Sequence, residues 1–71
     1  MSHWNHRVLR RGGPGERIFG VYEVYYDDDN QPRYCTSNPV GVVGETKAEM
    51  LELLDQMRDA LDDPILRYED F

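Results

Sequence analysis

The stretch that begins at Thr46 constrains the fold most, because it specifies both the start and the inner side of one helix. Residues 46–49 form a capping box, in which the Thr46 hydroxyl accepts from the amide of Glu49 and the glutamate reaches back to Thr46. Apolar residues then recur at spacings of three and four, which predicts an amphipathic helix. This stripe consists of Met50, Leu53, Leu54, Met57 and Leu61, and Leu51 widens it. Because Pro64 disfavours helical geometry in the residue before it, we expect a helix over 47–62.

The residues before this helix carry the alternating pattern of strands. Residues 17–26 are rich in β-branched and aromatic side chains and form the strongest expected strand. Residues 4–10 alternate as well, and a Gly/Pro-rich loop at 11–16 joins the two strands into a hairpin. An acidic turn at 27–32 leads to a third strand over 33–43, where Pro39 indicates an edge or an end. The side of 17–26 that carries Tyr22, Val24 and Tyr26 is the more apolar one, and we expect it to face the core.

Together these elements predict one α+β domain over residues 1–71. We expect a three-stranded antiparallel sheet in β-β-β-α order, with one amphipathic helix packed on one face and an extended C-terminal tail over 64–71. This tail either forms a last short strand or wraps over the sheet. A chain of 71 residues is near the lower limit for a single hydrophobic core and has no room for a large enclosed substrate cavity.

Several features point to a cytoplasmic protein. The only cysteine, Cys35, excludes an internal disulfide and is typical of a reducing compartment. Residues 1–7 lack the apolar run of a signal peptide, and no window approaches the roughly 18 apolar residues of a membrane span. The acidic balance also argues against direct binding to nucleic acid or to anionic membranes, which both require Lys/Arg clusters.

Negative charge is concentrated in the last third of the chain. The formal net charge is -6, and residues 1–34 are balanced. The carboxylates opposite the apolar stripe are the candidate partner-binding residues, with three turn residues as a second patch. The helix set is Glu49, Glu52, Asp55, Asp59, Asp62 and Asp63, and the turn set is Asp27, Asp28 and Asp29.

Local stability alone does not explain this helix face. Like charges three or four residues apart repel by roughly 0.2–0.5 kcal/mol per pair, and Asp62 and Asp63 lie at the helix end where the macrodipole disfavours anions. Carboxylates about 5–6 Å apart approximate the spacing of duplex phosphates, so a DNA-binding protein could accept them in place of DNA. An ordinary solvated helix face is the other interpretation.

No motif predicts catalysis or a cofactor. His3, His6 and Cys35 lack the paired spacing of a zinc site. The acidic turn begins like a calcium loop, but Pro32 stands where that loop needs glycine. Cys35 and His6 could in principle act as nucleophile and base, yet no glycine-rich elbow supports them. We therefore expect a non-enzymatic protein that has no metal and no cofactor.

Several segments resemble a known group of proteins. They are WNHRV at 4–8, GVYEVYYD at 20–27, NPV at 38–40, GET at 44–46 and PILRYED at 64–70. In these segments the chain resembles short bacterial and phage-borne proteins of unassigned function. More distantly, strand-turn-strand followed by Gly-Glu-Thr and a helix is similar to the N-terminal domain of HicB-type antitoxins. That resemblance implies a sheet with one packed helix that binds a small toxin.

The sequence thus predicts an interaction protein. The preferred form is an acidic inhibitor, of the anti-CRISPR or anti-restriction type, that occupies a basic nucleic-acid-binding surface of a partner protein. The alternative is a HicB-like module that holds a small toxin through its sheet edge and tyrosines, among them Tyr25 and Tyr34.

Overall fold

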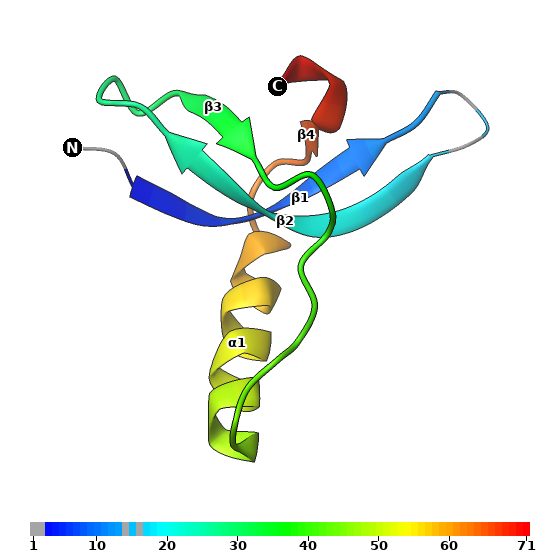
Figure 1. Cartoon of the computed structure of the whole chain (residues 1–71). Coiled ribbons are helices and arrows are strands. Elements are labelled where there is room, and N and C mark those ends of the chain that lie inside the picture. Colours follow the sequence, from blue (N-terminus) through cyan, green and yellow to red (C-terminus); the bar gives the residue numbers. More distant parts are fainter. Residues whose placement is uncertain (1–2, 14, 16) are drawn as a thin grey trace.

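The computed structural model describes residues 3–13, 15 and 17–71. It contains one helix and one sheet, so the α+β class is confirmed (Figure 1). The elements in chain order are β1 (His3–Arg11), β2 (Ile18–Tyr26), β3 (Pro32–Cys35), α1 (Lys47–Ala60), β4 (Leu66–Arg67) and the 3-10 helix η1 (Tyr68–Asp70).

The sheet differs from the expected one in both strand number and direction. Its four strands lie in the order β3-β2-β1-β4. β1, β2 and β3 pair antiparallel as predicted, whereas β4 pairs parallel to β1, with Leu66 opposite Leu9. The sheet is mixed because the chain leaves α1 beside β1 and then runs along that strand. Part of the expected extended tail is therefore a fourth strand.

The third strand is much shorter than the predicted 33–43. It ends at Cys35, and Pro39 follows in a segment that lacks regular structure. Two hydrogen bonds still hold this segment to β2, from the amide of Thr36 to the carbonyl of Glu23 at 3.0 Å and from the amide of Val40 to the carbonyl of Val21 at 2.8 Å. Residues 36–46 then run down beside α1 (Figure 1).

The hairpin loop predicted at 11–16 includes Pro14 and Glu16, which lie outside the described residues, as do Met1 and Ser2 at the N-terminus. Within the described part, Gly12 and Gly15 have φ values of 105° and 85°. A left-handed backbone of this kind favours glycine, which explains why the turn sequence is rich in it.

The buried core lies on the sheet face that the tail covers. Its centre is Leu9, Tyr22, Val24 and Tyr26, and the side chains of Cys35, Leu66 and Tyr68 pack against it. Tyr22, Val24 and Tyr26 thus face the core as predicted. Since successive strand residues point to opposite faces, His6 and Val8 lie on the other face, where the last turn of α1 meets β1.

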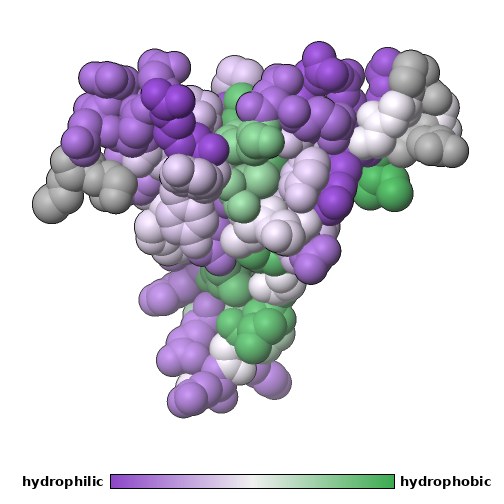
Figure 2. All heavy atoms as spheres, turned by 45° about the horizontal axis from the view of Figure 1, so that its top comes forward, coloured by the Kyte–Doolittle hydropathy of each residue, from purple (hydrophilic) through white to green (hydrophobic). Residues whose placement is uncertain are grey.

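α1 stands away from the sheet, so the expectation that it packs along one face is wrong. Only its C-terminal end meets β1, and its N-terminal end lies far from every strand (Figure 1). Ala60 is its only buried residue. Most of the predicted apolar stripe therefore remains exposed to solvent, and apolar side chains are visible on the projecting helix in Figure 2.

Candidate protein-binding surface

The N-terminus of α1 is built by the predicted capping box. Thr46 has an extended backbone, and its hydroxyl accepts a hydrogen bond of 3.1 Å from the amide of Glu49. The Glu49 carboxylate accepts a bond of 2.8 Å from the amide of Glu45, one residue earlier than the predicted Thr46. Glu49 therefore contributes to the helix cap and is only partly available to a partner.

The C-terminus of α1 comes two residues earlier than predicted. The helix ends at Ala60, and Leu61 is its C-cap. Asp62 and Asp63 follow in a turn, with their amides bonded to the carbonyls of Asp59 and Ala60 at 3.1 and 3.3 Å. Both carboxylates still lie near the negative end of the helix dipole.

Arg7 neutralises the charge of one of these two carboxylates and holds the C-terminal end of α1, the base of the helix, against the sheet. Its side chain is 13% exposed and forms an ion pair with Asp63 at 3.8 Å. It also donates to the carbonyl of Pro64 at 2.7 Å and to the hydroxyl of Tyr26 at 2.9 Å. One guanidinium thus joins β1, the core face of β2 and the turn that follows α1.

Within the predicted helix set, four carboxylates have neither an ion pair nor a hydrogen bond to another described residue. They are spaced three, four and three residues apart along α1 and the turn that follows it, all are exposed, and we call them the acidic row. The acidic row is Glu52, Asp55, Asp59 and Asp62. At these spacings the side chains of a helix are neighbours on one face.

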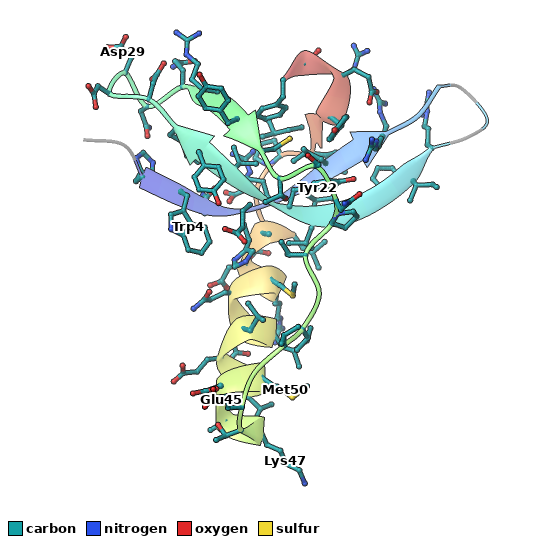
Figure 3. All side chains as sticks on the ribbon, in the orientation of Figure 1. Trp4, Tyr22, Asp29, Glu45, Lys47 and Met50 are labelled. Carbon is teal, nitrogen blue, oxygen red and sulfur yellow. The ribbon has the colours of Figure 1, made fainter. Side chains whose placement is uncertain are left out.

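A second surface of α1 is apolar and lies beside the acidic row. The part of the stripe that faces β1 and residues 36–46 is half-buried and consists of Leu53 and Met57. The remainder, which we call the apolar seam, is exposed and comprises Met50, Leu51, Leu54 and Leu61. Figure 3 shows Met50 projecting from the helix near its N-terminal end. The sequence identified most of these residues but did not indicate that they would lack a partner within the chain.

The acidic turn forms a separate site in which the Asp27 carboxylate is engaged on both oxygens. One Asp27 oxygen accepts from the amides of Asp29 and Gln31, each at 2.9 Å, and the other accepts from Arg33 at 2.6 Å. The Arg33 bond, aided by these amides, holds the pKa of the Asp27 carboxyl below its usual value. Asn30 supplies the left-handed residue of the turn, with φ 61°.

This turn does not extend the acidic row. It lies at the far end of the sheet from the tip of α1, as the positions of Asp29 and Glu45 in Figure 3 show. The two predicted acidic patches are therefore distinct surfaces.

The edge of the sheet carries exposed aromatic rings. Tyr34 on β3 is mostly exposed, and an open hollow of about 610 Å³ lies between Tyr25, Tyr34 and Arg33. The Tyr25 hydroxyl donates to the Glu23 carboxylate at 2.8 Å, and this hydrogen bond raises the pKa of Tyr25.

The end of the sheet near the tail carries positive charge that the sequence reasoning did not single out. A hollow of about 760 Å³ is lined by four arginines, by one acidic residue, Glu69, and by the aromatic residues Tyr68 and Phe71. The arginines of this hollow are Arg10, Arg11, Arg17 and Arg67. Arg11 stacks on Tyr68, with the guanidinium carbon 3.9 Å from the ring centroid. Only the three-dimensional pairing of β1 with β4 brings Arg10 and Arg67 side by side.

The only candidate catalytic pair is separated by the sheet. Cys35 pairs with Val24 on the core face, whereas His6 pairs with Glu23 on the opposite face. Burial also raises the pKa of the Cys35 thiol, which makes the thiolate less accessible. His3 stacks on Tyr26, and His6 lies edge-on to Trp4. Within the described residues, no three histidine, cysteine or acidic side chains cluster as metal ligands.

Comparisons with family models, with curated proteins and with solved structures found no match to this chain. The resemblances to phage-borne proteins and to HicB-type antitoxins therefore stay predictions. No helix in the part of the chain that the structure describes is long and apolar enough to cross a membrane.

Proposed function

We propose that this chain is a non-enzymatic interaction protein that binds a partner protein through the projecting helix α1. The observation that carries the proposal is the acidic row on a helix that stands away from its own sheet. A helix packed on its sheet buries its apolar side and exposes only a polar face, which needs no partner. α1 projects from the sheet and exposes both its acidic and its apolar surface. Such a protrusion can enter a groove that a flat sheet cannot.

In its specific form, the partner is a nucleic-acid-binding protein whose basic surface the helix occupies. Neighbouring carboxylates of the acidic row are about 5–6 Å apart at their Cβ atoms, which approximates the phosphate spacing that such a surface recognises. The chain would then act as an inhibitor of the anti-CRISPR or anti-restriction type. That comparison is an analogy based on size and charge.

A reversal of the acidic row tests this function. Wild type and the triple variant Glu52→Lys, Asp55→Lys, Asp59→Lys are immobilised and exposed to a bacterial lysate, and bound protein is eluted with a salt gradient. The matched control Asp29→Lys, Glu69→Lys, Asp70→Lys changes the net charge equally but leaves the row intact. We expect wild type and control to capture the same partner, which salt and duplex DNA release.

We expect the row variant to capture none of that partner while its circular dichroism spectrum stays unchanged. Capture by the row variant that equals wild type, or capture that neither salt nor DNA weakens, would contradict the proposal.

The exposed sheet edge favours a second candidate, the HicB-like module. β3 is a four-residue edge strand beside the hollow that holds Tyr25 and Tyr34, and an open edge of this kind can accept a strand from a partner. In that case the double variant Tyr25→Ser, Tyr34→Ser no longer captures the partner protein from the lysate, whereas the acidic-row variant still does.

A further inference from the structure

The exposed surface of this chain is larger than that of a compact monomer of its size. An 8.4 kDa monomer is expected to expose about 4,600 Å², whereas this chain exposes 5473 Å². The excess is roughly 900 Å², close to the area of about 800 Å² that each partner contributes to a standard protein interface. The excess exposed area is thus about what this chain would bury in one standard interface.

The apolar seam of α1 contributes to this exposed surface. Leu51, Leu54 and Leu61 are 62%, 47% and 69% exposed. Leu54 and Leu61 are seven residues apart, as are Met50 and Met57. This spacing repeats the a and d positions of two helices that pack on each other.

We propose that the apolar seam pairs with the same seam of a second copy of this chain, in an antiparallel helix pair. Charge placement favours a second copy. Counted at 3.6 residues per turn, the carboxylates of Glu52 and Asp59 lie on the side of the helix opposite the centre of the seam. The basic residues Lys47 and Arg58 lie within the seam, between Leu54 and Leu51. Two chains of net charge -6 can therefore meet without bringing their acidic rows together.

The antiparallel direction follows from the shape of the molecule. α1 joins the sheet at its C-terminal end, and the chain measures 37 × 35 × 21 Å. Paired helices lie about 8–10 Å apart, so a parallel pair would force two wide sheets into the same space. An antiparallel pair places the sheets at opposite ends. It also places Lys47 within about one turn of Asp62 in the second copy, which gives that carboxylate a counter-charge.

Sedimentation of the purified full chain tests the pairing. We expect a dimer at 100 μM that dissociates on dilution, and the substitution Leu54→Glu should weaken the dimer by at least about 100-fold because it puts two carboxylates into the seam. The matched control Gln56→Glu adds the same charge on the far side of the helix and should remain dimeric. A wild-type monomer at 100 μM, or a Leu54→Glu variant as dimeric as the control, would overturn the proposal.

Spin labels on Lys47→Cys, in a Cys35→Ser background, test the direction. An antiparallel pair separates the two labelled backbones by roughly 20–30 Å along the helices, whereas a parallel pair leaves them about 10 Å apart. The short distance would overturn the antiparallel arrangement. The proposal does not depend on the proposed function, because the acidic-row variant should stay dimeric and Leu54→Glu keeps its acidic row.

Discussion

Replacing Arg7 by methionine should remove the main polar connection between the sheet and the base of α1. Methionine keeps most of the stem volume but deletes the guanidinium, with its two hydrogen bonds and the ion pair to Asp63. The bond to Tyr26 lies beside the core, since that ring is buried. By contrast, the carbonyl of Pro64 and the carboxylate of Asp63 are exposed enough for water to replace the lost partner.

The magnitude follows from this difference in exposure. A hydrogen bond from a charged donor in a buried setting contributes about 1.5–3 kcal/mol, and an ordinary one contributes about 1 kcal/mol. A half-exposed ion pair adds about 0.2–1 kcal/mol. Arg7→Met should therefore lower the free energy of unfolding by about 3–5 kcal/mol. A chain of this length has a total of only about 3.5–10 kcal/mol, so the change is large.

Urea denaturation followed by circular dichroism measures the change, with an unaltered m-value as the check that both proteins unfold in the same way. Arg10→Met is the matched control, because Arg10 lies on the same strand and is also half-buried, but its side chain has no hydrogen bond or ion pair to another described residue. We expect the control to lose less than about 1 kcal/mol. An equal decrease in the free energy of unfolding for the two variants would refute the conclusion that Arg7 connects the sheet to the C-terminal end of α1.

Three further predictions concern the turn, the thiol and a close contact. The pKa of Asp27 in the folded chain lies below its usual value, so the ionised carboxylate stabilises the fold. This contribution is complete above the unfolded pKa of about 3.9 and is lost as the pH falls through the folded pKa. In the Asp27→Asn variant, the free energy of unfolding should therefore fall less steeply as the pH is lowered. An unchanged dependence on acidic pH would contradict this. Burial raises the pKa of Cys35, so iodoacetamide at pH 8 should modify the folded chain more slowly than the chain in urea, as followed by mass spectrometry. A Cβ at Gly20 would lie 3.1 Å from Pro39, whereas one at Gly41 would meet nothing within 4 Å. Gly20→Ala should therefore cost about 1–3 kcal/mol in thermal unfolding and Gly41→Ala should not, and similar losses would count against this contact.

Local patterns predicted the elements whose causes are local. The capping box predicted the first residue of α1 correctly, because Thr46 and Glu49 interact within one turn. The alternation of β2 identified Tyr22, Val24 and Tyr26 as core residues, since a strand has a fixed period of two. The turn after β2 followed from the tolerance of Asp and Asn for its backbone.

The wrong predictions concern contacts between distant residues. β4 is only two residues long and gains its hydrogen bonds from β1, 57 positions earlier in the chain. The local pattern therefore left a last short strand and a wrapped tail as alternatives and could not place β4 beside β1. The third strand was overestimated because Val40, Val42 and Val43 have strand propensity, although only Val40 is hydrogen-bonded to β2 and none of the three lies in a strand. An apolar stripe likewise shows that a helix needs a partner, but it does not say whether that partner belongs to the same chain.

The arginine hollow has a consequence for how this molecule moves toward a target. It gathers four of the eight basic side chains of the chain at one end of the sheet, while the acidic row projects on α1 from the other face. Such a separation gives the protein a permanent electric dipole that its net charge does not describe. In the field of a basic surface a single, dissociated copy of the chain should turn before contact and arrive with its helix first, and added salt should slow this oriented encounter. The end that remains exposed after binding would then be positive, although the protein is acidic.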